Sequence, residues 1–339
     1  MSVLVTGSNG FLGSVLVERL IAQGTKGIRC FVREGSNRSR LDRLRERHPE
    51  AEIEYYFGTL NSAGDPVGAV EGVSRIYHLA AALDGAPADM FLNTVVATKN
   101  LLEAVATHNP SVEMVHVSSF SVYGVADLPA GHILTEETPL EKHPEKRDPY
   151  AFVKWYQEKI VMEYQKRLDF PLVVLRPGVI YGPNGGGISG RVGLQLGGLF
   201  LHLGGSNRIP LSYVENCADA IIICAEQHGN GVAIYNVHDD DLPTSRAYLR
   251  SYKKKVKRLR SAPIPYPLLQ LISRGVEWYH HHSGGQLPAI FTPYKSANLW
   301  KGSRFDNSRL KETGWRQRIS TEEGMERTFS SLADAERRA

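Results

Sequence analysis

The sequence predicts an α/β fold: a doubly wound parallel sheet followed by a smaller, mostly helical domain. Strand and helix patterns alternate through the first 180 residues, which is typical of strands joined by helical crossovers on both faces of one sheet. A glycine-rich turn directly follows the first of these strands. The length of 339 residues is sufficient for about two domains of roughly 100–200 residues each.

Short apolar runs bounded by glycine or polar residues mark the expected strands, and segments with apolar residues at helical spacing lie between them. In the first half, the expected strands are Ser2–Thr6, Ile28–Val32, Arg75–Ala80, Glu113–Ser118 and Leu172–Leu175. The expected helices are Ser14–Gln23, Thr94–Thr107 and Tyr150–Leu168. This order predicts parallel pairing, because parallel neighbours need a long crossover between them.

The pattern changes after residue 178. Residues 182–205 are glycine-rich and loop-like, and the stretch from Pro263 to Trp300 indicates a mostly helical cap. Asn216–Glu226 and Val232–Val237 instead resemble one more helix and strand of the sheet. We therefore assign residues 1–180, with 214–237 returning to them, to the first domain, and 181–213 with 238–330 to the cap.

Composition excludes several classes of protein. The chain has no run of eighteen apolar residues, which argues against a membrane-spanning helix, and its N-terminus lacks the pattern of a secretory signal. The three cysteines, Cys30, Cys217 and Cys224, cannot form a disulfide framework, and we expect buried thiols. These features predict a cytoplasmic location.

The net charge of +4 comes from one segment. Residues 246–260 hold eight basic and no acidic residues, and the rest of the chain has a net charge of −4. This distribution argues against a nucleic-acid partner. The segment predicts a basic helical stripe with three possible roles: a solvated face, attraction of an anionic substrate, or contact with an anionic membrane surface.

The turn after the first strand has the properties of a phosphate-binding loop. In Gly7-Ser8-Asn9-Gly10-Phe11-Leu12-Gly13, the first glycine permits a tight turn, and the second allows close approach to a pyrophosphate. The third lets the following helix pack against the strand. Because unpaired N–H groups and the positive dipole end lie at that helix N-terminus, this pattern predicts a dinucleotide site.

The end of the second strand indicates which dinucleotide binds. NAD sites usually have an acidic residue there for the ribose hydroxyl, whereas this chain has Arg33, followed by Glu34. Arginine can pair with a 2′-phosphate through two hydrogen bonds, so we favour NADP(H). NAD(H) remains the alternative if Glu34 binds the hydroxyl and Arg33 is a solvated side chain.

Tyr150 and Lys154 lie four residues apart, on one face of an expected helix. A tyrosine with a pKa of about 10 is a poor acid or base near neutrality, and a nearby ammonium is expected to lower that pKa. Ser119 follows an expected strand, where a hydroxyl can hydrogen-bond a substrate carbonyl. Together these residues predict proton exchange with a small-molecule substrate.

These motifs, in this order, resemble the extended short-chain dehydrogenase/reductase family, which includes NAD-dependent epimerases and dehydratases. The matching segments are Thr6–Gly13, Ser119 to Gly124, Tyr150 with Lys154, residues 176–183 and residues 213–220. The resemblance implies a Rossmann fold with a C-terminal substrate-binding domain. It also implies a homodimer that pairs through two helices, one of them Tyr150–Leu168.

The resemblance implies a role for each matching residue. Ser119 and Tyr150 are the expected catalytic hydroxyls, with Tyr150 as the acid/base, and Lys154 is expected to hold the nicotinamide ribose. Hydride is then expected to pass between the nicotinamide and a substrate carbon. The expected cofactor-binding residues are Gly7, Asn9, Gly10, Phe11, Leu12, Gly13, Arg33, Leu60, Leu79, Ala80, Ala81, Tyr150, Lys154, Pro177 and Val179.

Departures from the family pattern narrow the reaction. Dehydratases usually carry an Asp-Glu pair where this chain has Phe120-Ser121, and the phosphate-binding arginine usual in epimerases is missing from residues 209–216 or displaced to Arg208. The apolar residues after Pro267 resemble the cap of the 3β-hydroxysteroid dehydrogenase and dihydroflavonol reductase branches. The leading hypothesis is therefore an oxidoreductase that acts on a ketone or secondary alcohol.

Two alternatives remain. The first is a nucleotide-sugar 4-epimerase with tightly bound NAD, for which Asn184, Arg191 and Arg208 are candidate diphosphate ligands. The second is a cofactor-sensing regulatory protein without enzymatic activity. The histidines in Tyr279–His282 could suggest a metal, but no cysteine or carboxylate pair completes a ligand set, and we expect a solvated loop and no metal.

Overall fold

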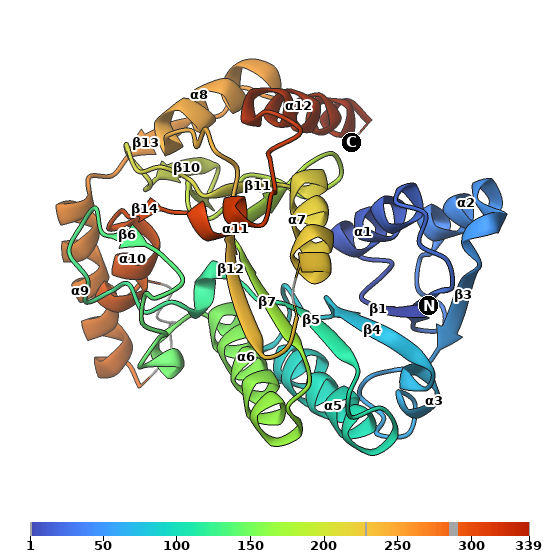
Figure 1. Ribbon diagram of the computed structural model, residues 1–339. Coiled ribbons are helices and arrows are strands. Elements are labelled where there is room, and N and C mark those ends of the chain that lie inside the picture. Colours follow the sequence, from blue (N-terminus) through green and yellow to red (C-terminus); the bar gives the residue numbers. More distant parts are fainter. Residues whose placement is uncertain (1, 228, 285–290, 339) are drawn as a thin grey trace.

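The computed structural model describes residues 2–227, 229–284 and 291–338. A seven-stranded sheet lies at its centre, and every neighbouring pair of strands in it is parallel (Figure 1). In sheet order, the strands are β12 (Val232–Val237), β7 (Leu172–Pro177), β5 (Glu113–Val117), β4 (Val73–His78), β1 (Ser2–Thr6), β2 (Ile28–Val32) and β3 (Ile53–Phe57). This arrangement confirms the predicted α/β fold class.

Helices cover both faces of the sheet (Figure 1). One face carries α1 (Phe11–Ala22), α2 (Ser39–Arg47) and α7 (Val214–Gln227), and the other carries α3 (Val67–Val70), α5 (Ala97–His108) and α6 (Pro149–Leu168). Successive residues of β1 alternate between the two cores: Val3 and Val5 pack with α1 and α7, and Leu4 packs with α5 and α6. Burial on both faces explains why the three central residues of β1 are all apolar.

A buried ion pair fixes α6 to the sheet. The guanidinium of Arg176 in β7 donates from Nε to Glu158 of α6 at 3.1 Å, and its Nη1 donates to the Tyr123 hydroxyl at 3.0 Å. The side chains of Arg176 and Glu158 are only 4% and 2% exposed. Since Tyr150 and Lys154 belong to the same helix, this pair also fixes their height above the sheet.

The remaining elements form small sheets and the helices of the cap. The short strands are β6 (Ile133–Leu134), β8 (Val179–Tyr181), β9 (Gly193–Leu196), β10 (Leu199–His202), β11 (Leu211–Tyr213), β13 (Ser261–Pro263) and β14 (Arg304–Phe305). The helices are α8 (Ser245–Lys255), α9 (Tyr266–His282), α10 (Pro293–Trp300), α11 (Ser308–Glu312) and α12 (Thr321–Arg338). Short helical turns are η1 (Pro49–Ala51), α4 (Pro87–Phe91), η2 (Leu92–Val96), η3 (Phe120–Val122) and η4 (Pro144–Lys146).

The structure corrects two local predictions. The glycine-rich stretch is not all loop, because β9 and β10 form an antiparallel hairpin in which a Cβ on Gly193 would lie 1.9 Å from the Leu201 carbonyl oxygen. Glycine is therefore needed there to let the strands approach. Tyr279–His282 form the last turn of α9 rather than a loop.

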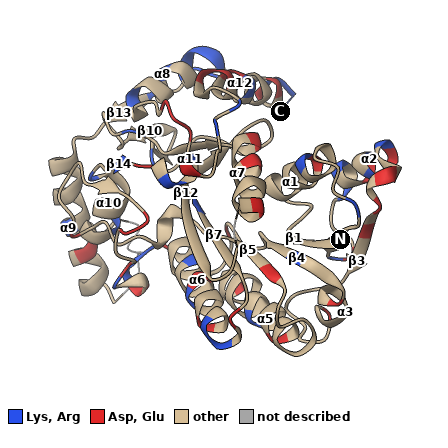
Figure 2. Ribbon diagram, viewed as in Figure 1, with Lys and Arg blue, Asp and Glu red and all other residues tan. Residues whose placement is uncertain are grey.

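The basic segment is partly neutralised by a distant part of the chain. Lys255 forms an ion pair with Glu326, and Lys257 pairs with Glu336, both on α12. Figure 2 shows the basic residues of α8 beside the acidic residues of α12. In the described residues, no helix combines the length and the apolar character that crossing a bilayer requires.

The three cysteines are buried and unpaired, as the sequence predicts. Burial raises the pKa of the Cys30 and Cys217 thiols to about 12 in each case, and it also raises the pKa of Cys224. Thiolates are the nucleophilic form of cysteine, so these three thiols are poor nucleophiles.

Candidate active site

The glycine turn brings β1 and α1 into close contact. Gly7 has φ +70°, and its carbonyl oxygen accepts from the Gly10 N–H at 3.0 Å. A Cβ on Gly13 would lie 2.0 Å from that same oxygen, and a Cβ on Gly7 would lie 3.0 Å from the Ala80 nitrogen. Helix α1 begins at Phe11 without a side-chain cap, so its first N–H groups remain available to an anion.

A chain of buried hydrogen bonds joins β1, β4 and α5 behind this turn. His78 Nδ1 lies 2.8 Å from Thr6 Oγ1, and His78 Nε2 lies 2.8 Å from Thr98 Oγ1. Burial, with the charge of Lys154, lowers the pKa of His78 to about 3, so this imidazole is neutral. These contacts fix Leu79, Ala80 and the loop that follows β4.

Ser119 and Tyr150 meet at the carboxyl end of β5. Ser119 Oγ accepts from the Ser121 N–H at 3.1 Å, which caps η3. Asp148 caps α6 by accepting from the Ala151 N–H at 3.0 Å, and this cap fixes the turn that carries Tyr150. Burial raises the pKa of the Tyr150 phenol, and a hydrogen bond with the Ser119 hydroxyl opposes that rise.

Lys154 is buried, but it does not act on Tyr150 as the spacing predicts. Its Nζ donates to the Val117 carbonyl at 2.7 Å and also to the Gln157 amide oxygen. Burial lowers the pKa of Lys154 to about 7, against the opposing charge of Glu158. Because the ammonium is turned toward β5, the pKa of Tyr150 is raised by burial rather than lowered by Lys154.

Gln157 is a site residue that sequence reasoning missed. Its Nε2 donates to the Ala80 carbonyl at 2.9 Å and to Thr98 Oγ1 at 2.8 Å, while its amide oxygen accepts from Lys154. It therefore links Lys154 to the loop after β4. Its position one turn beyond Lys154 on the same helix face is the signal that could have revealed it.

The adenine end of the predicted site is open to solvent. Arg33 follows β2 and is exposed, and its carbonyl accepts from the Ser36 hydroxyl at 2.7 Å. Asn9 Nδ2 donates to the Asn37 carbonyl at 3.3 Å, which joins the glycine turn to the loop after β2. Arg38, which the sequence prediction did not include, lies with its guanidinium 4.9 Å from the centre of the Phe57 ring.

The other predicted cofactor residues lie along the same sheet edge. Leu60 follows β3 and is buried, and its carbonyl accepts from Asn100 Nδ2 at 2.8 Å. Pro177 is the last residue of β7, and the Val179 N–H donates to the Pro210 carbonyl at 2.7 Å. Since the carboxyl ends of parallel strands meet at one edge, these residues and the glycine turn border one crevice.

The residues at this edge fit a dinucleotide. The Gly7–Gly13 turn leaves a cradle that side chains would fill, and α1 presents its N-terminus toward it. Ser118 Oγ and Ser121 Oγ, on either side of Ser119 in the chain, are buried and have no hydrogen-bond partner among the described residues. Unsatisfied buried hydroxyls of this kind are expected where a bound molecule supplies the partner.

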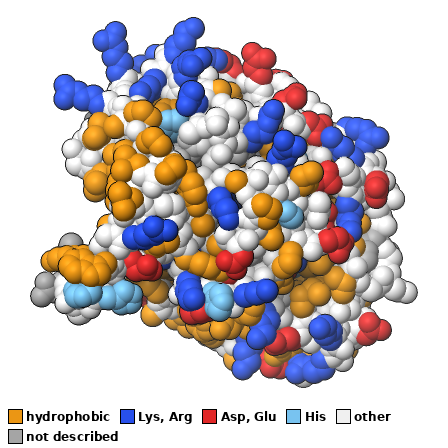
Figure 3. All heavy atoms as spheres, turned by 90° about the vertical axis from the view of Figure 1, so that its left-hand side faces the viewer, with side chains coloured by type: hydrophobic (Ala, Val, Ile, Leu, Met, Phe, Trp, Pro, Cys, Tyr) orange, Lys and Arg blue, Asp and Glu red, His pale blue; other side chains and the backbone are white. Residues whose placement is uncertain are grey.

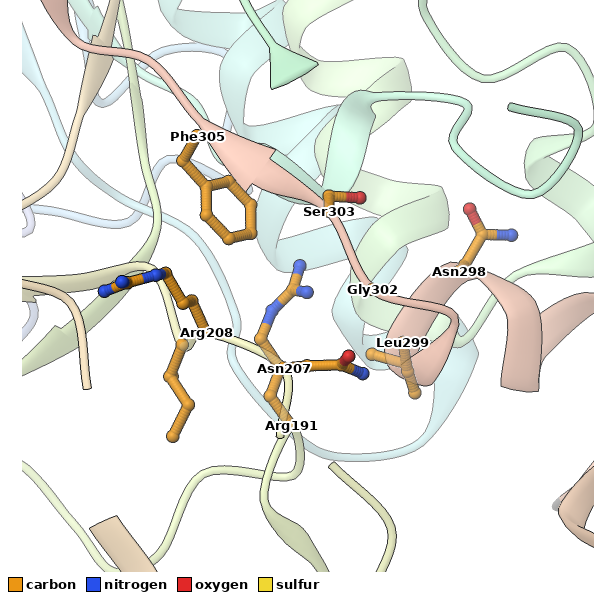
Figure 4. A pocket seen from close by; sticks show the side chains of 9 residues that line it. Arg191, Asn207, Arg208, Asn298, Leu299, Gly302, Ser303 and Phe305 are labelled. Atoms are coloured by element: carbon orange, nitrogen blue, oxygen red, sulfur yellow. The ribbon is translucent and has the colours of Figure 1, made fainter. Parts of the chain in front are cut away.

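A pocket lies between the loops that carry Arg191 and Arg208 and the end of α10 (Figure 4). Its lining residues are Arg191, Asn207, Arg208, Ile209, Asn298, Leu299, Gly302, Ser303 and Phe305. Phe305 stacks on Phe120, beside Ser119, with ring centres 5.6 Å apart. Arg191 is close enough to Asp148, the cap of α6, for its pKa to respond to that charge. Phe305 thus links the pocket lining to the residue that follows Ser119.

The guanidinium of Arg191 has no acidic partner within the described chain, and Figure 4 shows it pointing into the pocket. Burial and the charge of Arg147 lower the pKa of Arg191 to about 10. Arg208 Nη1 donates to the Leu242 carbonyl at 2.7 Å. Asn184, the third candidate diphosphate ligand, lies elsewhere, with its N–H donating to Ser331 Oγ at 3.3 Å.

Comparison with relatives gives two kinds of match. Sterol demethylase protein B of Methylococcus capsulatus is 32% identical over 187 residues, which are 54% of this chain and 52%, about half, of that relative. Sterol-4-alpha-carboxylate 3-dehydrogenase, decarboxylating, of Homo sapiens is 23% identical over 97% of this chain and 87% of its own length. The second match thus extends over nearly the whole chain.

Among solved structures, UDP-glucose 4-epimerase from Bifidobacterium longum in complex with NAD+ and UDP has a TM-score of 0.71 and 19% identity. The alignment covers 100% of this chain and 98% of that one. This likeness supports the fold. The family model of the NAD dependent epimerase/dehydratase family matches residues 3–237, well over half of the chain. The protein therefore belongs to the NAD dependent epimerase/dehydratase family, as the motifs around Gly7, Ser119 and Tyr150 predict.

Proposed function

We propose that the protein is an NAD(P)-dependent oxidoreductase that moves hydride between the nicotinamide and a ketone or secondary alcohol. The observation that carries this proposal is that Ser119, at the end of β5, and Tyr150, in the first turn of α6, lie at the sheet edge that also holds the glycine turn, close enough for the Ser119 hydroxyl to lower the pKa of Tyr150. A bound dinucleotide supplies the hydride acceptor or donor. In this proposal, the chain itself orients the substrate oxygen and exchanges its proton.

Each catalytic group has a distinct task. Ser119 hydrogen-bonds the substrate oxygen, while the Tyr150 phenol gives or takes the proton on that oxygen. Lys154 reaches the same crevice from one turn further along α6 and binds the nicotinamide ribose. Gln157 positions Lys154, because it accepts from its ammonium and donates to the Ala80 carbonyl at 2.9 Å.

The relatives support the ketone or alcohol class. The Homo sapiens relative that matches nearly the whole chain is named as a 3-dehydrogenase of sterol carboxylates. Phe120 stands where dehydratases carry an acidic residue, and it is packed against Tyr123 and Phe305. An apolar ring at that position cannot serve as the acid that dehydration requires.

We propose NADP(H) as the preferred cofactor, because Arg33 is exposed at the end of β2 and free to meet a 2′-phosphate. Arg33→Ser should weaken NADPH binding by about 10- to 100-fold, the range expected for one lost charge-assisted contact. NADH binding should change little. Titration of both dinucleotides into wild type, Arg33→Ser and the control Arg43→Ser measures this. Equal affinity of wild type for NADH and NADPH would contradict the preference.

A nucleotide-sugar 4-epimerase is the second candidate, and the Arg191–Arg208 pocket favours it. Arg191 points into this pocket, and Arg208 lines it while donating to the Leu242 carbonyl. Guanidinium groups suit a diphosphate, which accepts several charge-assisted hydrogen bonds, and Arg208 would have to release that carbonyl to bind one. The dinucleotide that co-purifies, together with turnover on both substrate classes, separates the two functions. Tightly held NAD and interconversion of UDP-sugars would establish the epimerase. NADPH consumption with ketones would establish the reductase.

Arg191→Met should raise the melting temperature while weakening binding of an anionic substrate. The wild-type guanidinium is desolvated without a carboxylate partner, and replacing such a charge by an apolar side chain of similar size often stabilises a protein. KM for an anionic substrate should rise by about 10-fold or more. Arg43→Met, at an exposed position on α2 far along the chain from the pocket residues, is the control that should leave the melting temperature unchanged. A lower melting temperature for Arg191→Met would refute the argument.

A cofactor-sensing regulator remains the non-enzymatic alternative. Dinucleotide binding without turnover on a broad substrate panel would favour it.

We further propose a cytoplasmic location, because three unpaired buried thiols suit a reducing compartment. We also propose a homodimer that pairs through α6, where Phe152, Trp155 and Tyr156 form a half-buried aromatic cluster. Light scattering measures the mass in solution.

A further inference from the structure

Helix α9 exposes a long apolar stripe to solvent. Leu271 and Trp278 are 64% and 60% exposed, and Leu268, Ile272 and Tyr279 are each at least 40% exposed. Their spacing of three, four or seven residues places them along one side of the helix. Large apolar side chains that are contiguous and half exposed mark an interaction surface rather than a normal protein exterior.

The opposite side of α9 is already used for packing. Leu269 is 2% exposed, and Ser273 Oγ lies 2.8 Å from Ser296 Oγ of α10. The inner side therefore packs α9 against the cap, while the apolar stripe on the outer side remains exposed to solvent. Seventeen residues span about 25 Å at 1.5 Å per residue, so the stripe is long compared with a single side-chain contact.

A second apolar element lies near the start of the stripe. The turn of the β9–β10 hairpin carries Leu196 and Leu199, which are 62% and 38% exposed and pair across the two strands. Strand β13 pairs with β10 and leads, within three residues, into α9. The hairpin and the helix are thus fixed to one another by a small sheet.

Basic side chains without acidic partners border these apolar elements. The Phe200 N–H donates to the Arg260 carbonyl at 2.9 Å, which places Arg260 beside the hairpin. Arg250, Lys254 and Arg258 are exposed and form no ion pair with any described residue, unlike Lys255 and Lys257. Figure 3 shows Lys and Arg side chains gathered along one border of the hydrophobic side chains on this face.

We propose that this face, the α9 stripe with the hairpin turn and the flanking basic residues, docks the protein on an anionic lipid bilayer. Apolar side chains enter the headgroup region while Lys and Arg remain with the lipid phosphates and carboxylates. A second copy of the chain fits less well, because a two-fold contact brings the same basic border against itself. The contact is at the surface, since no described helix is able to span a bilayer.

Docking through this face would bring a pocket of the cap close to the lipid surface. Helix α10 packs against α9, and its Asn298 and Leu299 line the pocket into which Arg191 points. Docking through α9 therefore places that pocket close to the lipid surface. The docking proposal does not depend on hydride transfer, and its test needs no turnover.

The experiment measures flotation of the full chain with vesicles of phosphatidylcholine and phosphatidylserine at 3:1, and with phosphatidylcholine alone. Wild type should float with the anionic vesicles and much less with the neutral ones. Arg250→Glu with Lys254→Glu and Arg258→Glu should weaken anionic binding by on the order of 100-fold, at roughly fivefold per basic residue. Charge reversal at the distant exposed residues Arg43, Arg47 and Lys166 is the matched control and should have little effect.

Leu271→Asp with Trp278→Asp should also abolish flotation, whereas Val232→Asp, on the far edge strand, should not. All these side chains are substantially exposed, so melting temperatures should stay near wild type. Trp278 provides a direct signal, because it is 60% exposed, whereas Trp155 is half-buried and Trp300 and Trp315 are buried. Its emission should shift to the blue with anionic vesicles, and Trp155→Phe should keep that shift.

Three results would overturn the proposal. The first is no binding of wild type to anionic vesicles. The second is binding that survives both sets of substitutions. The third is self-association of wild type without vesicles that Leu271→Asp with Trp278→Asp removes, because a second copy would then cover the stripe.

Discussion

Tyr150→Phe should lower turnover by about 10²- to 10⁴-fold while leaving dinucleotide affinity unchanged, the range expected for loss of a general acid/base. The substitution removes only the phenol oxygen, which in the proposed mechanism exchanges the substrate proton. The ring remains to pack with Val153 and the aromatic side chains around it. The measurement is kcat and KM with whichever substrate class, ketones or UDP-sugars, the enzyme turns over, together with titration of the dinucleotide.

A matched control lies on the same helix. Tyr156 is half-buried and packs on Phe152, with ring centres 4.8 Å apart, but its hydroxyl does not reach the catalytic residues. Tyr156→Phe should therefore keep full turnover. If Tyr150→Phe turned over substrate as fast as Tyr156→Phe, Tyr150 would not be the acid/base, whatever the reaction.

The lowered pKa of Lys154 and the raised pKa of Tyr150 differ from what their spacing on the helix predicts. Spacing along a helix predicts that Lys154 stabilises the Tyr150 phenolate, yet Lys154 donates to the Val117 carbonyl at 2.7 Å and to Gln157. With its pKa lowered to about 7, Lys154 carries its charge below that pH and loses it above. The helix positions both residues, but the sheet behind them decides where the ammonium points.

Local patterns predicted the sheet well. Strands β1, β2 and β12 have the predicted bounds, since each is a short apolar run bounded by residues that end a strand. Helix α6 begins one residue before its predicted start, where Asp148 caps it and Pro149 opens it. These elements are recognisable because each is defined by its own residues and their immediate neighbours.

Features built from distant segments could not be predicted in the same way. Arg191 and Asn298 lie 107 residues apart in the chain, and only the fold places both at one pocket. Lys255 similarly forms its ion pair with Glu326, which belongs to another helix. The chain of hydrogen bonds through His78 and Thr98 could not be predicted, because no periodic pattern in the sequence distinguishes a buried polar residue from its apolar neighbours in the core.

The glycine turn supports a second large effect. Gly13→Ala should lower dinucleotide affinity by about 10-fold or more and reduce stability by about 1–3 kcal/mol, the usual cost of overpacking. The added methyl would lie 2.0 Å from the Gly7 carbonyl oxygen and 2.8 Å from the Gly7 carbonyl carbon. Both atoms are backbone, so neither can move aside without displacing the turn or α1. The same displacement would widen the cradle that receives the pyrophosphate.

Gly275→Ala is the matched control, because Gly275 is also inside a helix and an added Cβ there meets nothing within 4 Å. Alanine stabilises a helix by about 0.5–1 kcal/mol relative to glycine, so Gly275→Ala should be neutral or stabilising. In Gly13→Ala, the same gain partly offsets the cost of the clash. Thermal unfolding without dinucleotide measures the change in stability, and the increase in melting temperature on adding dinucleotide reports its binding. If Gly13→Ala melted like Gly275→Ala and bound dinucleotide normally, α1 would not need to pack this closely on the turn. The glycine spacing would then be a feature of the turn alone and not of the cofactor site.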